Sequence, residues 1–149
     1  MLTLTGLYAL QALLYLAGRD RSTQVTASAM ARELDIPGTY LAKILQRLVR
    51  ERMLESTRGP RGGYRLLPDP SELTVAEAVT PFQELQTRQI CLLGGPCDLD
   101  NPCTAHARRS AWNSRTLDLM KQTTLADLLS GIPMEGLAQV GESTRENPR

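Results

Sequence analysis

The sequence predicts a mainly α-helical fold that contains one short β-hairpin. Apolar residues make up 42% of the 149 residues but aromatic residues only 4%, so the core must consist mostly of Leu, Ala, Val and Ile. A core of this kind favours helices over a β-sandwich. Apolar residues recur at helical spacing, and glycine and proline interrupt the pattern at a few points. A chain of this length forms one ordinary domain, or one small domain with an appendage.

The first predicted helix runs from Leu4 to Gly18 and is apolar on most sides, which indicates a buried helix. Its apolar run, Leu7–Ala17, lacks a basic start and a small-residue cleavage site, and it is too short to cross a bilayer. We therefore expect a soluble, cytoplasmic protein with no membrane partner.

Two further helices are predicted on either side of a tight break. Thr26 is expected to cap a short helix that continues to Leu34, and the break follows at residues 35–38. Thr39 is expected to cap the next helix, which runs to about Arg52 and buries one apolar stripe. The opposite face of that helix is polar and basic, with Thr39, Lys43, Gln46, Arg47 and Arg50. The pattern is typical of a helix-turn-helix, although an amphipathic surface helix would show it too.

A short hairpin is predicted next. Residues 53–58 and 64–67 are the expected strands, and Gly59-Pro60-Arg61-Gly62-Gly63 is the turn between them. Glycine lets a backbone approach nucleic acid closely, and arginine binds phosphate or enters a minor groove. A tight turn alone would explain the glycines but not the flanking Arg58, Arg61 and Arg65. Helices followed by a basic hairpin have the element order of a winged helix-turn-helix with a two-stranded β-wing.

The charges of the chain are unevenly distributed. Residues 1–70 carry ten Lys/Arg against six Asp/Glu, whereas residues 71–149 carry seven against ten. A basic patch in a nearly neutral chain indicates a surface that meets phosphates, with a solvated basic face as the alternative. We expect residues 1–70 to be a DNA-binding domain for double-stranded DNA. The candidate phosphate and base contacts are Thr39, Tyr40, Lys43, Gln46, Arg47, Arg50, Arg58, Gly59 and Arg61.

Residues 71–130 are predicted to form a second region. Thr74 is expected to cap a connector helix, a cysteine-containing loop spans residues 90–106, and a long helix spans residues 102–121. Asn101-Pro102 is the expected start of the long helix, because Asn caps well and Pro suits the first turn. A short helix follows near residues 124–129. Residues 131–149 lack periodicity, and we expect a flexible tail there.

The long helix carries a seam that is suited to a partner helix. Ala105, Trp112 and Leu119 recur at intervals of seven residues. We expect these residues to form the interface of a homodimer, since winged-helix proteins bind two-fold DNA sites as dimers. Trp112 as an anchor within one chain is the alternative.

All three cysteines and the single histidine fall within residues 90–106. Cys91, Cys97, Cys103 and His106 offer four donors, the number that a zinc ion or the irons of an iron–sulfur cluster require. In a reducing compartment such a group is more typical of metal or redox chemistry than of disulfides. A structural zinc site and a metal-free thiol redox switch are the alternatives. A Cys–His nucleophile has no oxyanion-hole or substrate motif beside it, so we expect neither an enzyme nor a small-molecule substrate.

Taken together, these motifs resemble the IscR- and NsrR-type winged-helix transcription regulators. The resemblance covers about residues 2–129. It rests on Gly6-Leu-Tyr8-Ala-Leu10, Tyr40-Leu-Ala-Lys-Ile-Leu45, Arg58-Gly-Pro-Arg-Gly-Gly-Tyr64, the Cys-x5-Cys-x5-Cys-x2-His spacing and Thr124-Leu-Ala-Asp-Leu128. The resemblance implies a homodimer crossed by the long helix, with an iron–sulfur cluster near the interface and paired winged helices on a palindromic promoter site.

The resemblance also bears on the type of cluster. IscR-like members hold a 2Fe-2S cluster with three cysteines and a histidine that is placed like His106. NsrR-like members hold a 4Fe-4S cluster with an additional acidic ligand near the start of the first helix. Here the first acidic residue is Asp20, beyond that helix, and Tyr8 occupies the matching region. The resemblance therefore favours 2Fe-2S over 4Fe-4S, and an apo form without a cluster is also expected.

We therefore expect a transcription regulator that senses iron–sulfur, redox or nitric-oxide status through the loop from Cys91 to His106. Loading, oxidation or loss of the cluster would shift the population of dimer conformations and so change the affinity for the operator.

Overall fold

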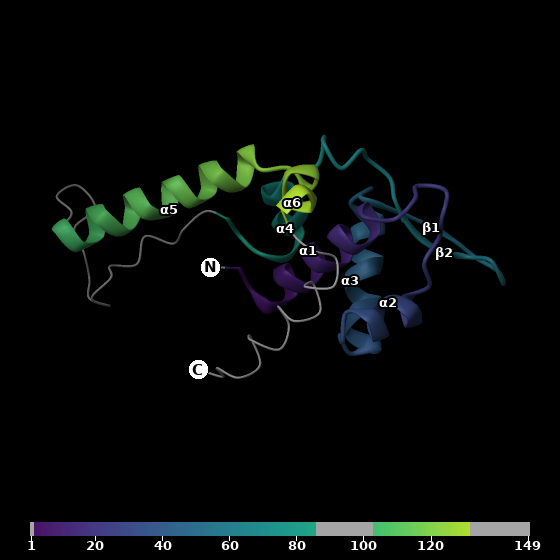
Figure 1. Ribbon diagram of the computed structural model, residues 1–149. Helices are drawn as coiled ribbons and strands as arrows, with labels where there is room; N and C mark the ends of the chain where they lie inside the picture. Colours follow the sequence, from purple (N-terminus) through teal and green to yellow (C-terminus); the bar gives the residue numbers. More distant parts are fainter. Residues whose placement is uncertain (1, 86–102, 132–149) are drawn as a thin grey trace.

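The computed structural model describes residues 2–85 and 103–131 (Figure 1). The elements are α1 (Leu4–Ala17), α2 (Ala27–Glu33), α3 (Gly38–Arg50), β1 (Leu54–Thr57), β2 (Gly63–Leu66), α4 (Val75–Val79), the 3-10 helix η1 (Thr80–Phe82), α5 (Thr104–Gln122) and α6 (Leu125–Gly131). The predicted winged helix-turn-helix is confirmed. Helix α5 extends away from the other described elements, while α4 and α6 lie together beside α1 (Figure 1).

Helix α1 is the centre of the core. It contacts α3, α4, α6 and β2, and its residues from Tyr8 to Leu16 are all buried. This burial explains why α1 is apolar on most sides, because a helix surrounded by other elements has no solvent-facing side. Its bounds were predicted to within one residue: Thr3 caps the start, and Gly18 is the C-cap.

The helix-turn-helix differs from the prediction at both ends of α3. Thr26 caps α2 as expected, but Thr39 does not cap α3. Pro37 is the N-cap, because its carbonyl oxygen accepts the backbone N–H groups of Tyr40 and Leu41 and so closes the first turn. The helix ends at Arg50 because Arg52 has a positive φ of 59°, which turns the chain back upon itself.

The wing is a two-stranded antiparallel sheet in which Leu54 pairs with Leu66 and Thr57 with Gly63. A backbone bridge from Val25 to Tyr64 ties the segment before α2 to the wing. This close approach requires glycine, since a Cβ at Gly63 would lie 2.7 Å from the carbonyl oxygen of Val25.

Helices α4 and α6 are held together at their N-termini. The Val75 N–H donates to the carbonyl of Thr123, and the Leu125 N–H donates to the carbonyl of Leu73, each at 2.9 Å. Both helices also begin with a capping box, Thr74–Glu77 and Thr124–Asp127. We call this pair of linked helix starts the α4–α6 clamp. It fixes the C-terminal end of α5 to the body of the molecule.

The start of α5 was predicted incorrectly. Cys103 is the N-cap, with an extended backbone (φ −62°, ψ 158°), so the helix begins at Thr104. Asn101 and Pro102, the predicted cap and first helical residue, lie outside the described residues. The helix also continues one residue past the predicted end, to Gln122.

The clamp is expected to weaken in acid. Hydrogen bonds from the backbone and hydroxyl of Thr124 hold the pKa of Asp127 below its usual value. A lowered pKa means that the folded state prefers the carboxylate, so this stabilisation is present above the unfolded pKa and is lost as the pH falls through the folded one. In thermal melts, Asp127→Asn should therefore be less stable than wild type at pH 7, and the difference should shrink towards pH 3. Asp118→Asn on α5 is the control, and a difference that stays constant over this range would contradict the prediction.

Candidate nucleic-acid interface and metal centre

The outer face of α3 is the candidate surface for reading DNA. Leu41, Ile44, Leu45 and Leu48 are buried against the core, and this anchors one side of the helix. The opposite side is exposed, and it carries the predicted contacts Thr39, Lys43, Gln46, Arg47 and Arg50. The structure therefore places these five predicted contacts on one accessible helical face, as entry into a major groove requires.

Tyr40, unlike the other predicted contacts on α3, is held by contacts with another helix of the domain. Its side chain is half-buried, and its hydroxyl is hydrogen bonded to the hydroxyl of Thr5 in α1. Its ring also lies edge-on to the ring of Tyr8, with 5.9 Å between the centroids. We conclude that Tyr40 holds the start of α3 against α1 and thereby positions the exposed face.

Ion pairs divide the basic residues into two groups. Arg47 pairs with Glu51 at 3.0 Å, and Arg65 of the wing pairs with Glu55 at 2.6 Å, so both charges are partly neutralised within the domain. In the part of the chain that the structure describes, Lys43, Arg50, Arg58 and Arg61 are exposed and make no ion pair. These four cations remain available to phosphates.

Two residues missed by the sequence analysis belong to this surface. Arg52 follows α3 directly, is exposed and makes no ion pair with any described residue. Its position within the basic part of the sequence could have indicated that Arg52 belongs to this surface. Gln24 donates from its amide nitrogen to the hydroxyl of Thr57 at 2.8 Å and so supports the wing. No local pattern could have indicated this contact, because the two residues are distant in the sequence.

The predicted metal ligands are only partly described. Cys91 and Cys97 lie outside the described residues, and among the described residues no group of three possible ligands gathers. Cys103 is exposed at the N-cap of α5, where the partial positive charge of the helix N-terminus favours a thiolate. Cys103 precedes the helix as its N-cap, and His106 lies inside the helix three residues later.

His106 is the residue that best fits a ligand role. Its side chain is only 6% exposed, although its helix is largely solvent-facing. Its Nδ1 atom is buried and has no hydrogen-bond partner among the residues that the structure describes. A buried polar atom without a partner is costly and calls for an explanation, and a bound metal supplies one. Three thiolates and one neutral imidazole nitrogen suit an iron–sulfur cluster, and they suit zinc equally well.

The predicted seam of α5 is strongly exposed. Trp112 is 74% exposed and Leu119 is 63% exposed, while Ala105 is half-buried. Trp112 is therefore not an anchor within the chain. Among the helices of the described residues, none is both long and apolar enough to cross a membrane.

A helix-turn-helix with an exposed basic helix, followed by a wing in which Arg58 and Arg61 make no ion pair with described residues, defines a winged-helix DNA-binding protein. The chain belongs to the Rrf2 family, whose model is described as an iron-dependent transcriptional regulator and matches residues 2–131. It is a transcriptional regulator and not an enzyme.

The relatives agree with this assignment. A protein of Aquifex aeolicus named as an HTH-type transcriptional regulator is 35% identical over 127 residues, or 83% of this chain and 87% of the relative. The transcriptional regulator IscR of Escherichia coli is 29% identical over 129 residues, or 87% and 80% of the two chains. The structure of CymR, the global cysteine regulator of B. subtilis, has the same fold, with a TM-score of 0.72, 20% identity and coverage of 89% and 98%.

Proposed function

We propose that this regulator binds promoter DNA as a cytoplasmic homodimer and senses iron–sulfur, redox or nitric-oxide status through a cluster held by Cys91, Cys97, Cys103 and His106. A 2Fe-2S cluster is favoured over 4Fe-4S. The observation that carries the proposal is the buried imidazole of His106, whose Nδ1 atom has no hydrogen-bond partner within residues 2–85 and 103–131. The family description as iron-dependent supports iron over zinc at this donor set.

In the proposed complex the outer face of α3 enters the major groove and the wing lies beside the adjacent backbone. Lys43, Arg50, Arg58 and Arg61 are the principal phosphate or base contacts, because their charges are not neutralised by described carboxylates. Thr39 and Gln46 lie on the same exposed face as hydrogen-bonding side chains. Gly59, with a φ of 111°, lets the tip of the wing turn closely.

The proposed signal passes along α5. Cys103 and His106 lie at the N-terminal end of this helix, and the α4–α6 clamp holds its C-terminal end. Because α5 is one continuous helix, a displacement of its N-terminal end changes the orientation of the winged helix that is attached to its C-terminal end. When bound, the cluster supplies a redox-sensitive and acid-labile anchor for the start of α5. The cluster thus shifts the equilibrium between two conformations of the dimer. Because the two conformations bind the operator with different affinities, the overall affinity changes.

The test is anaerobic purification of the full chain, followed by visible spectroscopy and by iron and acid-labile sulfide analysis. We expect about two irons and two sulfides per subunit. A DNA duplex selected from a random library on the loaded protein should bind with a different affinity after the cluster is removed. If the purified protein contained stoichiometric zinc and no sulfide, the site would be a structural zinc site and not a cluster site. DNA affinity that responds to thiol oxidation in metal-free protein would establish the thiol switch instead.

A further inference from the structure

The N-terminus of α1 is capped by side chains from two distant parts of the chain. The hydroxyl of Thr3 accepts the N–H of Gly6 at 3.1 Å, as an N-cap threonine does. In a complete capping box the third helical residue is Glu or Gln, and its side chain accepts the N–H of the N-cap residue. That position in α1 is Gly6, which has no side chain. The N–H of Thr3 donates instead to Oε1 of Gln83, at 2.6 Å.

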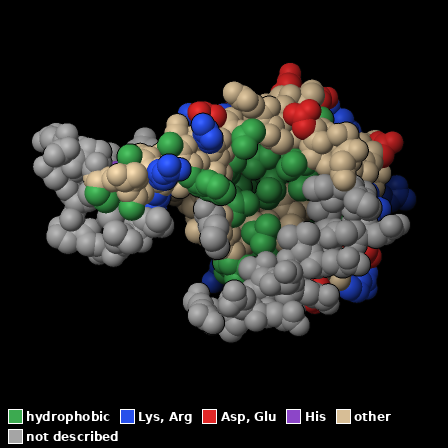
Figure 2. Space-filling view, turned by 60° about the vertical axis from the view of Figure 1, so that its left-hand side comes forward, with side chains coloured by type: hydrophobic (Ala, Val, Ile, Leu, Met, Phe, Trp, Pro, Cys, Tyr) green, Lys and Arg blue, Asp and Glu red, His purple; other side chains and the backbone are tan. Residues whose placement is uncertain are grey.

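Gln83 reaches the start of α1 from the end of η1. It is the C-cap residue of η1, which packs against α1. Its side chain is half-buried and lines a hollow of about 360 Å³ together with Leu2, Val75 and Leu85. Hydrophobic side chains gather on the body of the molecule beside the base of α5 (Figure 2). Packing of this kind around a side chain restricts its rotamers, so the amide of Gln83 is held at the first turn of α1.

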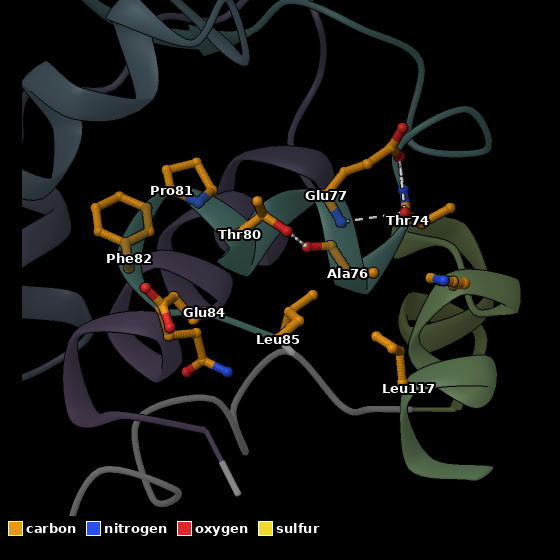
Figure 3. Close-up of a pocket in the computed structure, with 11 residues that line it drawn as sticks. Thr74, Ala76, Glu77, Thr80, Pro81, Phe82, Glu84, Leu85 and Leu117 are labelled. Carbon is orange, nitrogen blue, oxygen red and sulfur yellow. Dashed lines mark hydrogen bonds between the residues drawn. The ribbon is translucent and has the colours of Figure 1, made fainter. Parts of the chain in front are cut away.

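The absence of a side chain at Gly6 makes this contact possible. A Cβ at Gly6 would lie 2.8 Å from Oε1 of Gln83 and 3.5 Å from its Cδ. The amide of Gln83 therefore occupies the space that a side chain at Gly6 would need. Helices α4 and α6 complete their capping boxes locally, as the Thr74–Glu77 pair in Figure 3 shows for α4. In α1 the second half of the capping box is supplied by η1.

The first turn of α1 also holds the start of α3. The hydroxyl of Thr5 is hydrogen bonded to the hydroxyl of Tyr40, which lies in the first turn of α3. From Tyr8 to Leu16 helix α1 is buried in the core, whereas Thr3 is exposed and Thr5 is half-buried. Packing therefore fixes the middle of α1, and its first turn depends on the cap.

We propose that Gln83 is a positioning residue for DNA recognition. Its amide keeps the first turn of α1 helical, so that Thr5 holds Tyr40 and Tyr40 holds the basic face of α3 at the angle that the operator requires. This inference rests on the proposed function, in which α3 reads DNA. Neither Gln83 nor Thr5 is among the predicted DNA contacts, so a change at either residue reaches the DNA through the position of α3.

The first test replaces Gln83 in the full chain. Gln83→Met keeps the length of the side chain and removes the acceptor, and it should lower the affinity for the selected duplex by about tenfold, because base contacts are displaced at both half-sites. Gln83→Glu keeps an oxygen acceptor at a helix N-terminus, where a negative charge is favourable, and should bind like wild type. Glu84→Gln, at the exposed next position, is the control and should also bind like wild type. Fluorescence anisotropy measures the affinities at a temperature well below the midpoint of each variant's thermal melt.

The second test rebuilds the cap within α1. Gly6→Glu in a Gln83→Ala background gives the helix a local capping box, and the shorter side chain at position 83 leaves room for it. This double variant should recover both the thermal stability and most of the DNA affinity that Gln83→Ala alone loses. Recovery of stability without recovery of affinity would overturn the proposal, because Gln83 would then act by a route other than the first turn of α1.

Thr5→Val tests the next step and does not depend on how well the double variant folds. It removes the hydroxyl that bonds Tyr40 and should lower DNA affinity by a factor similar to that of Gln83→Met. The two losses should not add when the variants are combined, since both act through Tyr40. Fully additive losses would overturn the proposal.

The variant of α3 in which Lys43 and Arg50 are both alanine separates this inference from the proposed function. If that variant loses affinity while Gln83→Met binds like wild type, the positioning role of Gln83 is overturned and the proposed function stands. If both bind like wild type, α3 does not read DNA, and the proposed function fails together with the inference.

Discussion

Replacing Lys43 and Arg50 with alanine is expected to weaken promoter binding by at least about a hundredfold. Removing one base or phosphate interaction costs about 1–3 kcal/mol, and a dimer is affected at both of its half-sites. Both side chains lie on the exposed face of α3 and make no ion pair with described residues. The thermal stability should change little, since neither side chain is buried. Fluorescence anisotropy with the selected duplex measures the affinity.

Two arginines provide matched controls for this experiment. Arg21→Ala removes a cation that pairs with Asp69 at 3.0 Å and donates to the carbonyl of Leu67, just after β2; Arg21 is not on α3 or at the tip of the wing, so the change should leave DNA binding unchanged. Arg47→Ala should have an intermediate effect, because its charge is shared with Glu51. A loss of log affinity for Arg21→Ala that is half that of the double variant or more would show that net charge acts alone and would remove α3 from the proposed interface.

The contribution of the wing to DNA binding is tested separately in the same binding assay. Arg58→Ala with Arg61→Ala should reduce the slope of log affinity against log salt by about 0.9 for each phosphate that the variant no longer neutralises. Discrimination between the selected duplex and a scrambled one should fall less than with the α3 variant, since phosphate contacts carry no sequence information. An unchanged slope would exclude the wing from the interface.

Replacing His106 with alanine is expected to abolish stable cluster binding, with the iron content of the purified protein falling by more than about tenfold. The apo protein should remain folded, because the buried Nδ1 atom makes no hydrogen bond to a described residue that alanine would remove. His106→Cys should retain iron and sulfide, since a thiolate is also a cluster ligand, and its visible spectrum should differ from that of wild type.

Ser110→Ala, at an exposed position one turn further along the same helix, is the control for changes in the helicity of α5. Iron retained at the wild-type level in His106→Ala, and lost in Cys103→Ala, would show that three cysteines bind the metal and that the histidine has another role. The DNA-binding fold would be unaffected by that result.

The sequence was sufficient for the fold because its strongest signals are periodic. The apolar stripe of α3 faces the core as predicted, and the glycine-rich turn between β1 and β2 forms the wing. The errors fall at helix ends. Thr39 was a good capping residue by type, but the carbonyl oxygen of Pro37 already closes the first turn. Which carbonyl does so depends on backbone geometry that residue type alone does not encode.

The candidate site could be predicted only where it follows from helical spacing. Lys43 and Arg50 lie on the exposed face because of their positions relative to the buried stripe. The contact between Tyr40 and Thr5 of α1 was not predicted, because no local pattern reports a contact between such distant residues. The burial of His106 is likewise a tertiary property, since the rest of its helix is largely exposed.

The α4–α6 clamp has a consequence for how the chain folds as it is made. Leu125 of α6 is fully buried in the core that surrounds α1, the first helix of the chain. The carbonyl of Leu73 accepts the N–H of Leu125, and the N–H of Val75 donates to the carbonyl of Thr123, so neither bond can form early. Helix α1 therefore emerges from the ribosome with part of its apolar surface uncovered, and that surface stays exposed until α6 has been synthesised. The ribosome must therefore translate residues 90–106, which contain the three cysteines, before the N-terminal winged helix can complete its core.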